Sequence, residues 1–471
     1  MPDYRVIVIG AGPGGTILAR ELATQGVSVD LYEKGNYDEL GHDWSDAMEL
    51  VALKAAGLQM PRLEGKQWVG ELVKEQPGAP GIFEKHAVPR LLLASPGLIS
   101  SKEVDFKMIT TDRRRLAQLL INQALEAGVR VHYGQEGRKL LFREKEGYGP
   151  DGVEVFGVRV ADLETGEEKE LLADLIVESS GFKAVLRTGL PPETGLAAKF
   201  MPADFALVHR EVRVYDSGSD LAHAVPDYYR YGFHTGYQWS HIHNDQSIDV
   251  GAGVKNEPGK PDPEDLIEEF ISRHPAIKGE RLRGGRSLCI VGSPLTNFLA
   301  TGFLVLGDAA STSVPTTGCG AGSAIMAALW AAEVISEAAA EGRNDLQRLW
   351  PVNVKFFLTD QRGASFAALS SLRVMLQNLT HDELDFLFVN DLLDADTLQD
   401  AVNGRFKPPG LQKKIRALTG GLKNINLLLK LNKAVSAAAS LYNHYLAYPA
   451  QWNPERYRQW LEKAEKLHAI R

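Results

Sequence analysis

Three glycines near the N-terminus stand at a spacing that lets a backbone hold a phosphate group. Gly10, Gly12 and Gly15 follow Arg5 to Ile9, a run whose last four residues are all β-branched. The first glycine allows a tight turn, the second lets the backbone approach a pyrophosphate, and the third lets a helix pack close to the strand. The helix predicted from Thr16 to Gln25 would point its N-terminus at the phosphates. The other loop residues expected at this site are Pro13 and Gly14.

An acidic residue completes this pattern. A second predicted strand, Val27 to Tyr32, leads into Glu33 and Lys34. A carboxylate in this place can accept hydrogen bonds from ribose hydroxyls. Strand, glycine loop, helix, strand and acid follow one another in the order of a βαβ unit. The sequence therefore predicts a dinucleotide site, which this motif alone leaves open between FAD and NAD.

A later segment carries groups suited to the sugar chain and ring of a flavin. Phe303 to Leu306 predicts a buried strand, which presents Gly307 and Asp308. The carboxylate of Asp308 can bind ribityl hydroxyls, and the loop of residues 315–322 can lie along an isoalloxazine ring. The helix after the loop would favour an anionic reduced flavin. The loop residues expected at the cofactor are Pro315, Gly318, Gly320, Ala321 and Gly322.

This segment and two others resemble, in their order, the FAD-binding domains of the glutathione-reductase-type superfamily. Thr110 to Leu116 is similar to an Asp-Arg-x-x-Leu helix start, so the resemblance implies that Arg113 reaches the cofactor. Ala173 to Arg187 is similar to the second nucleotide motif and retains Gly181. Aromatic hydroxylases carry aspartate where this chain has Ser180. The resemblance implies FAD, and Ser180 counts against an aromatic hydroxylase.

The resemblance narrows to the geranylgeranyl reductase family over about the first 340 residues. Residues 41–47 are similar to that family's segment around Cys-Gly-Asp, with Asp46 and Ala47 retained and Trp44 in place of the cysteine. Residues 236–254 resemble its Tyr-x-Trp-x-Phe-Pro strand and the glycine-rich strand that follows. Tyr237 and Trp239 match that motif. The Phe-Pro positions hold His241 and Ile242.

Members of this family use FAD to saturate double bonds of isoprenoids, so the resemblance implies a reductase acting on a hydrophobic lipid-like substrate. The alkene must lie over the flavin in a dry cavity while a proton is supplied, and aromatic faces can stabilise developing positive charge. The residues expected to act there are Trp44, Tyr237, Trp239 and His241. A class A type flavin monooxygenase and a membrane-associated electron-transfer or quinone-reducing flavoprotein are the alternatives. The reductant is NAD(P)H or a protein electron donor.

The amino-acid composition argues against several other classes of protein. The net charge of −8 argues against general nucleic-acid binding. Two cysteines cannot ligate a Cys₄ iron–sulfur cluster, and no metal centre is expected. We expect a cytoplasmic protein, because no run approaches the ~20 apolar residues of a membrane span. Residues 405–433 combine basic and leucine residues, which is typical either of contact with a membrane surface or of a helix packed on the core.

The order of the motifs predicts the domain organisation. The FAD-contacting segments must converge in space, which gives a discontinuous Rossmann-like FAD-binding domain of residues 1–62, 103–195 and 285–340. Residues 63–102 and 196–284 then form a substrate domain built on an antiparallel sheet, since aromatic and β-branched residues alternate there. Residues 341–471 are expected to be mainly helical. The predicted fold class is α/β with an inserted antiparallel sheet.

Overall fold

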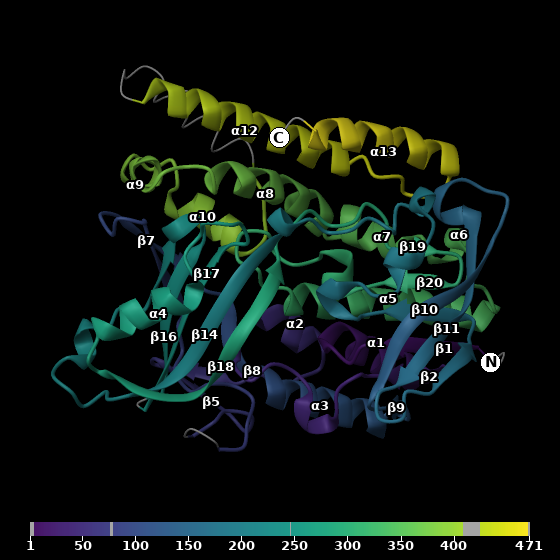
Figure 1. Cartoon of the computed structure of the whole chain (residues 1–471), viewed down its shortest axis with the longest axis horizontal. Helices are drawn as coiled ribbons and strands as arrows, with labels where there is room; N and C mark the ends of the chain where they lie inside the picture. The colour runs from purple at the N-terminus through teal and green to yellow at the C-terminus, as the bar shows by residue number, and fades with distance from the viewer. Residues whose placement is uncertain (1–3, 76–78, 245, 408–423, 470–471) are drawn as a thin grey trace.

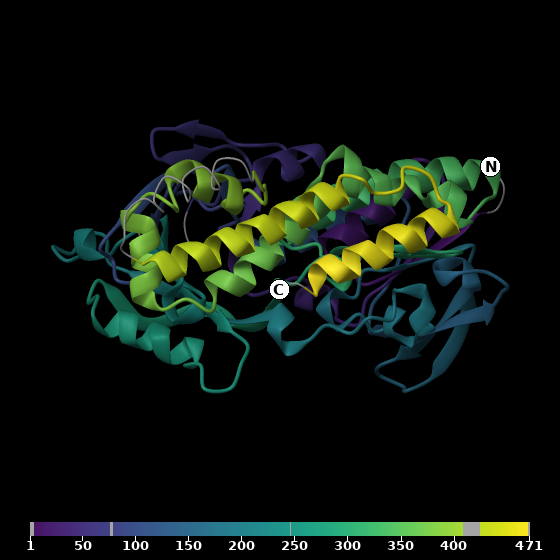
Figure 2. The same cartoon turned by 90° about the horizontal axis from the view of Figure 1, so that it is seen from above.

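The computed structural model describes residues 4–75, 79–244, 246–407 and 424–469. It has two sheet-based parts, with helices along one side of both (Figure 1). A parallel sheet near the N-terminus lies to the right in that view, and an antiparallel sheet lies to the left. Seen from above, the last two helices run along most of the length of the molecule (Figure 2). The expected α/β class, with an inserted antiparallel sheet and a helical C-terminal region, is confirmed.

The parallel sheet has the strand order β19-β20-β13-β1-β2-β9, and only β19 runs antiparallel to its neighbour. Its central strand β1 (Arg5–Ile9) is almost wholly buried, which explains the unbroken apolar run. The other strands are β2 (Ser28–Tyr32), β9 (Arg130–His132), β13 (Leu175–Glu178), β19 (Leu299–Ala300) and β20 (Phe303–Val305). The predicted FAD segments supply all six strands.

Three helices pack around this sheet. They are α1 (Pro13–Thr24), α3 (Arg113–Glu126) and α5 (Ala321–Glu341). Of the helices in the described ranges, α5 alone is long and apolar enough to span a bilayer, by length and composition. It contacts α1 and is largely buried, as core helices are. A three-stranded sheet extends this part and consists of β10 (Gln135–Glu144), β11 (Val153–Asp162) and β12 (Glu168–Leu172).

The second sheet has the order β18-β14-β17-β16-β15-β6-β7. Its strands are β6 (Arg90–Ala94), β7 (Ser101–Asp105), β14 (Phe205–Tyr215), β15 (Tyr228–Tyr231), β16 (Tyr237–Asn244), β17 (Ser247–Lys255) and β18 (Ile277–Ile290). Helix α4 (Pro263–Ser272) covers one face with Leu266, Ile267 and Phe270. The other face turns toward the FAD-binding part. The predicted boundaries at residues 103 and 285 fall inside β7 and β18, so the exact division into domains stays a prediction.

Short elements join the two parts. They are α2 (Leu50–Ala55) and the paired strands β3 (Ser45–Glu49) with β8 (Met108–Asp112) and β4 (Arg62–Glu64) with β5 (Gln67–Val69). The C-terminal helices are α6 (Leu346–Leu349), α7 (Pro351–Val354), α8 (Arg362–Leu376), α9 (His381–Val389), α10 (Ala395–Val402), α12 (Ile425–Tyr445) and α13 (Pro454–His468). A second apolar core forms where α8, α9, α10 and α12 meet strands β6 and β7. This core lies beside the open face of the antiparallel sheet.

Candidate active site

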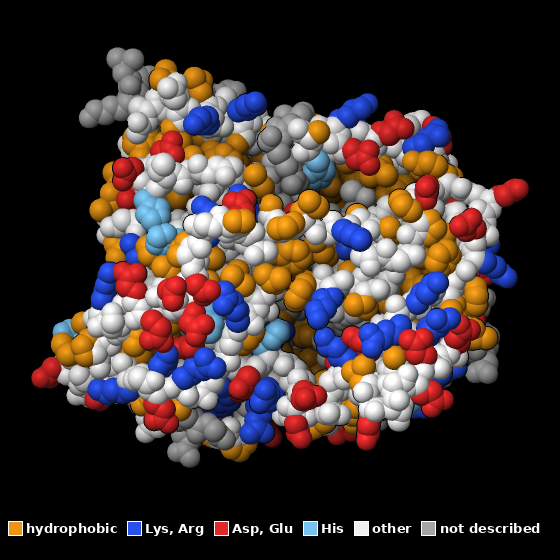
Figure 3. Space-filling view, in the orientation of Figure 1, with side chains coloured by type: hydrophobic (Ala, Val, Ile, Leu, Met, Phe, Trp, Pro, Cys, Tyr) orange, Lys and Arg blue, Asp and Glu red, His pale blue; other side chains and the backbone are white. Residues whose placement is uncertain are grey.

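The predicted cofactor residues converge on one cavity of about 420 Å³. Those that line it are Gly10, Gly12, Pro13, Gly14, Glu33, Lys34, Asp46, Arg113, Gly181, Gly307, Asp308, Gly318, Gly320 and Ala321. Gly15, Pro315 and Gly322 lie outside its lining, and Ala47 lines a neighbouring cavity instead. A hollow between the two parts of the molecule, with apolar side chains inside and Lys and Arg at its edge, is visible in Figure 3.

The glycine loop has the shape that a pyrophosphate requires. A Cβ added at Gly10 would overlap the Ser179 carbonyl, and one added at Gly15 would overlap the Gly10 carbonyl. At Gly12, by contrast, an added Cβ would meet no atom within 4 Å, so the backbone there borders open space. Neither α1 nor α5 has a side chain that caps its N-terminus. Their first N–H groups are therefore available to an anion.

Two carboxylates shape opposite ends of this cavity. Glu33 accepts hydrogen bonds from the backbone N–H groups of Ala11 (2.7 Å) and Gly35 (2.9 Å), so it holds the glycine loop as well as facing the ribose position. At the other end, Asp308 accepts a hydrogen bond from Ser313 Oγ (2.8 Å), and burial raises the pKa of Asp308. Both carboxylates are partly buried, and the hydroxyls of a bound sugar or ribityl chain can supply hydrogen-bond donors to them.

A buried arginine ties the second nucleotide motif to the third. Arg187 is fully buried and donates to the carbonyls of Ala309 (2.7 Å) and Leu196 (2.5 Å). Glu178 accepts backbone hydrogen bonds from Leu186 and Arg187, each 2.8 Å long. Burial raises the pKa of Glu178 in spite of these bonds. This network fixes the loop after β13 against the turn that carries Asp308.

Aromatic residues of the antiparallel sheet form the roof of the cavity. Tyr237 and Trp239 alternate on β16, and their ring centroids are 5.5 Å apart. Trp239 lies over Gly251 of the paired strand, where no side chain could fit beneath the indole. The Tyr237 hydroxyl donates to the Thr317 carbonyl (3.0 Å), which ties the roof to the loop of residues 315–322. The roof therefore meets the loop expected along the flavin ring.

Arg210 is a site residue that the sequence reasoning missed. It lines the cavity and pairs with Asp46 (3.2 Å) and Asp249 (2.6 Å), which come from different parts of the molecule. Asp249 also accepts a hydrogen bond from Trp239 Nε1 (2.9 Å). The sequence showed Arg210 as one of several charged residues among the valines of β14, but its partners lie far away in the chain. This network positions Trp239 above the cavity.

Trp44 also lines the cavity, beside the predicted Asp46. It stacks on His42 with ring centroids 4.2 Å apart and an interplanar angle of 5°. Burial, followed by the charge of Arg113, lowers the pKa of His42 to about 4. His42 is thus a stacking partner of Trp44.

His241 is set apart from the other predicted catalytic residues. It shares the sheet face of Tyr237 and Trp239, but it lines neither this cavity nor its neighbour. Its Nδ1 lies 2.7 Å from Asp227 Oδ1. The structure thus brings Trp44, Tyr237 and Trp239 to one cavity and places His241 behind its wall. The roles of all four remain predictions.

A second cavity, of about 690 Å³, adjoins the first. We call it the apolar chamber, because much of its lining is apolar, with leucine and aromatic side chains from β6, β15, α8 and α12. Residues 393–407, which include α10, supply a large part of the wall and add charged side chains, among them Asp394, Asp400 and Arg405. Tyr229, Tyr237, Thr317 and Cys319 line both cavities. Burial raises the pKa of Cys319 to about 12, so this thiol stays protonated. A long apolar molecule in the chamber would reach the flavin position at these four residues.

Only part of the basic C-terminal segment can be placed. Residues 408–423, most of its predicted membrane-facing stretch, lie outside the described residues. Within α12, Leu427, Leu428 and Leu431 are buried, whereas Leu429 is 57% exposed. In the described part, these leucines therefore mostly belong to the core, and contact with a membrane stays a prediction.

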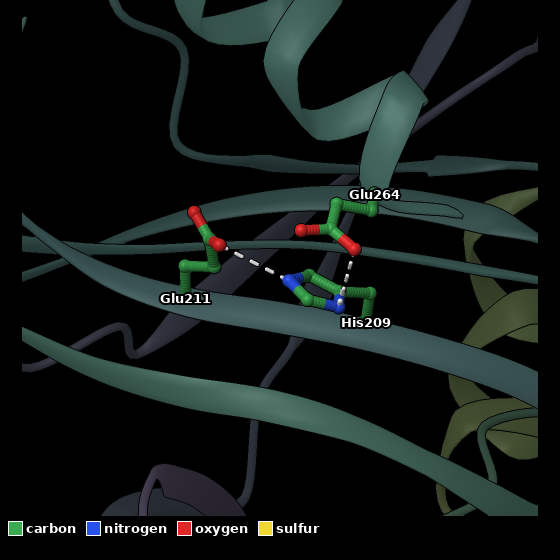
Figure 4. Close-up of side chains that lie close together, drawn as sticks. All are labelled: His209, Glu211 and Glu264. Carbon is green, nitrogen blue, oxygen red and sulfur yellow. Dashed lines mark hydrogen bonds and ion pairs between the residues drawn. The ribbon is translucent and has the colours of Figure 1, made fainter. Parts of the chain in front are cut away.

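One cluster elsewhere has residue types that can bind metals. His209 Nε2 lies 3.1 Å from Glu211, and its Nδ1 lies 3.9 Å from Glu264 (Figure 4). The two nitrogens of the ring thus face different carboxylates. Arg213 and Arg281 already pair with Glu211. The geometry is that of an ion-pair network between β14, β18 and α4.

Comparisons with known proteins agree with this geometry. A family model described as an NAD(P)-binding Rossmann-like domain matches residues 8–46. A digeranylgeranylglycerophospholipid reductase of Sulfolobus acidocaldarius is 24% identical, and the match covers 98% of this chain and 97% of the relative. A reductase of the same name from Methanothrix thermoacetophila is 26% identical, and the match covers 81% of this chain and 90% of that relative.

Solved structures share the fold. A geranylgeranyl bacteriochlorophyll reductase-like protein of Thermoplasma acidophilum has a TM-score of 0.66 at 19% identity, covering 92% of this chain and 99% of that one. A flavin-dependent brominase has a TM-score of 0.56 at 14% identity, and the match covers 98% of this chain and 99% of the brominase chain. At such identities these two likenesses establish the fold alone. The resemblance seen in the sequence is confirmed, and it extends beyond the first 340 residues.

Proposed function

We propose that this chain, a member of the geranylgeranyl reductase family, is an FAD-dependent oxidoreductase that saturates carbon–carbon double bonds of an isoprenoid lipid. The observation that carries this proposal is the meeting of the apolar chamber with the cofactor cavity at Tyr229, Tyr237, Thr317 and Cys319. A monooxygenase of small aromatic substrates has no use for so long an apolar space. Similarity to reductases of a digeranylgeranyl phospholipid supports the substrate class.

The residues present fit FAD along the whole cavity. The open backbone at Gly12 and the N-terminus of α1 suit the pyrophosphate, Glu33 the ribose and Asp308 the ribityl chain. The backbone of residues 318–321 and the N-terminus of α5 suit the ring edge. Bound there in its reduced form, FAD supplies a hydride.

The protein positions the alkene, limits its contact with water and stabilises the positive charge that develops on it. The apolar part of the chamber wall favours a hydrocarbon chain over water and can hold the alkene beside the cofactor cavity. Trp44, Tyr237 and Trp239 offer aromatic faces to positive charge that develops on the alkene. The bond from Tyr237 to Thr317 and the Arg210–Asp249–Trp239 network keep two of these rings in place. We assign these three aromatic residues to the cavity wall that faces the substrate.

Anaerobic single-turnover reduction of a lipid tests the proposal. Protein reduced with dithionite is mixed, without oxygen, with a phospholipid that carries geranylgeranyl chains. Flavin reoxidation should accompany a mass gain of two hydrogen atoms per double bond. Reduced protein that is inert to the lipid, but forms a hydroxylated product with oxygen, would instead favour the monooxygenase reading.

A matched pair of variants links that result to the chamber. Leu93 lies in the chamber wall and is 2% exposed, whereas Leu172 ends the edge strand β12 and is 60% exposed. Leu93→Trp should fill the chamber and slow lipid reduction while FAD stays bound. Leu172→Trp should leave both unchanged. Equal lipid-reduction rates for the two variants would show that the substrate does not bind in the chamber.

The electron donor and the membrane contact belong to the same proposal. We propose reduction by transiently bound NAD(P)H or a carrier protein, tested by anaerobic flavin bleaching with each donor. We also propose that residues 405–433 contact anionic lipid. Binding to anionic vesicles that disappears at high salt supports that contact, because each surface cation contributes ~1 kcal/mol. Absence of binding at low salt rejects it.

A further inference from the structure

An ion pair lies against the first turn of α5. Glu49, the last residue of β3, and Arg362, the first residue of α8, form two hydrogen bonds of 3.1 and 3.0 Å between carboxylate and guanidinium. A Cβ added at Gly322 would come within 3.2 Å of three side-chain atoms of Glu49. Arg362 also donates to Ser323 Oγ at 2.9 Å. The pair therefore meets the helix at two successive residues.

Other residues of the same turn border the cofactor cavity. Gly320, Ala321 and Ala324 line that cavity, whereas Gly322 and Ser323 do not. No side chain caps the helix, so its first N–H groups leave a partial positive charge at this terminus. A single turn of helix thus separates the space expected to hold the flavin ring from the ion pair.

The pair is largely shielded from solvent. The Arg362 and Glu49 side chains are 11% and 17% exposed, and salt screens charges in such surroundings less than it screens surface charges. Asp360 Oδ1 accepts a further hydrogen bond from Arg362 Nε at 2.8 Å. Burial opposes the charge of Arg362, but Glu49 and then Asp360 raise its pKa. The guanidinium therefore stays protonated beside two carboxylates.

The charge of Glu49 reaches the loop expected along the flavin ring. Cys319 belongs to that loop and lines both cavities. Burial is the main cause that raises the pKa of Cys319 to about 12, and the carboxylates of Asp46 and Glu49 add to the rise. A Glu49 carboxylate without its arginine would therefore oppose negative charge at this end of the cofactor cavity.

An uncommon backbone conformation precedes Arg362. Gln361 has a φ of 63°, in the left-handed region that residues other than glycine seldom adopt. Its side-chain oxygen accepts a hydrogen bond from the Tyr442 hydroxyl of α12 at 3.1 Å. Lys355–Thr359, just before it, form a π-helical turn, a feature that is frequent at functional sites. The C-terminal helical region thus supplies a fixed positive charge to the FAD-binding part.

We propose that Arg362 is a positioning residue that sets the redox potential of the bound flavin by neutralising Glu49 at the N-terminus of α5. Two-electron reduction with uptake of one proton leaves a negative charge on the flavin ring, and a positive helix terminus favours that form. Arg362 does not line the cofactor cavity. It acts through Glu49, whose full charge would otherwise oppose the partial charge of about +0.5 at the terminus. The inference requires FAD in its cavity but does not depend on the lipid substrate.

The midpoint potential of the FAD-bound protein tests the proposal without any substrate. The protein is reduced slowly under nitrogen beside a reference dye of known potential. Arg362→Gln leaves Glu49 unpaired and should weaken the binding of reduced relative to oxidised flavin roughly tenfold. For a two-electron couple, this change lowers the potential by about 30 mV. Glu49→Gln removes the negative charge and should raise the potential.

Further variants separate charge from packing. The double variant of Glu49→Gln and Arg362→Gln has the summed charge of the wild type and should regain its potential. Arg362→Lys keeps the positive charge and should also stay close to the wild type. Lys355→Gln is the matched control, because Lys355 pairs with Glu333 of the same helix, roughly 16 Å beyond Gly322 at 1.5 Å per residue. This variant should leave the potential unchanged.

The signs of the shifts separate the outcomes. A potential that is unchanged in Arg362→Gln, or that falls equally in Arg362→Lys and in the double variant, would overturn the proposal. If Arg362→Gln does not fold or retain FAD, Glu49→Gln carries the test, and an unchanged or lower potential in that variant would overturn it. The expected shifts in a protein that does not reduce the lipid would support the role of Arg362 and place the fault in the proposed substrate.

Discussion

Replacing Gly251 with alanine should displace Trp239 from the roof of the cofactor cavity. An added Cβ would overlap atoms Cζ2, Cε2 and Cη2 of the indole. Trp239 is 3% exposed and is fixed by its bond to Asp249, so it has little room to move. Overpacking of this kind costs roughly 1–3 kcal/mol. Because the indole lines the cofactor cavity, the flavin absorption band should shift as well.

A double-mutant cycle isolates this clash. Phenylalanine lacks the part of the indole that the new Cβ would meet, so Gly251→Ala should cost at least about 1 kcal/mol less in a Trp239→Phe background. Urea unfolding and flavin spectra measure the four proteins. Gly279→Ala is the matched control, since a Cβ there, in β18 of the same sheet, meets no atom within 4 Å. A Gly251→Ala protein as stable as this control, with an unshifted spectrum, would refute the reasoning.

Three further outcomes are expected. Gly12→Leu should leave the stability of the apoprotein unchanged but abolish FAD binding, measured by flavin absorbance, because its side chain would enter the open phosphate space. Asp112→Asn should lower the free energy of unfolding by about 1.5–3 kcal/mol, since it removes one of the two carboxylates that pair with Lys74 and Arg283 and leaves only Glu84. Asp262→Asn, at the cap of α4, should cost less than about 1 kcal/mol in the same urea assay. Burial opposes ionisation of Glu211, but bonds to His209 and Arg213 lower its pKa to about 2. Ionised Glu211 therefore stabilises the folded state at pH values above its unfolded pKa, and this contribution is lost as the pH falls toward 2. Glu211→Gln should accordingly flatten the acid side of a plot of the free energy of unfolding against pH.

Much of the nucleotide site followed from sequence because its parts are local. Glycine spacing, a buried strand and a terminal acid lie within one βαβ unit, and physical needs dictate each of them. The predicted residues Gly12, Glu33, Asp308 and Gly320 indeed line one cavity. Gly15 lies outside the cavity lining, in the close helix–strand contact that the glycine spacing predicts, and Ala47, Pro315 and Gly322 also lie outside it. Local chemistry is thus readable when one short segment contains all of it.

The charged networks could not be predicted from the sequence, because their members lie far apart in the chain. Arg210 pairs with Asp46, 164 residues away, and this contact exists only after β14 and β3 are brought together by the fold. A lone arginine in a strand gives no indication of which carboxylate will meet it. Pairs of this kind must be compensated when they are buried. A buried charged residue in a strand therefore indicates that an oppositely charged partner exists, but the sequence does not identify that partner.

His241 shows how a motif departure acquires meaning only from its surroundings. In the sequence, histidine at a phenylalanine position indicates either a proton donor or a hydrogen-bonded core residue. Asp227 lies 14 residues earlier, just before β15, and bonds to the imidazole. His86, from a third segment, lies 3.8 Å from the same carboxylate. The environment of this histidine, with Nδ1 held by Asp227 and Nε2 without a hydrogen-bond partner in the described residues, therefore depends on segments that the motif itself does not contain.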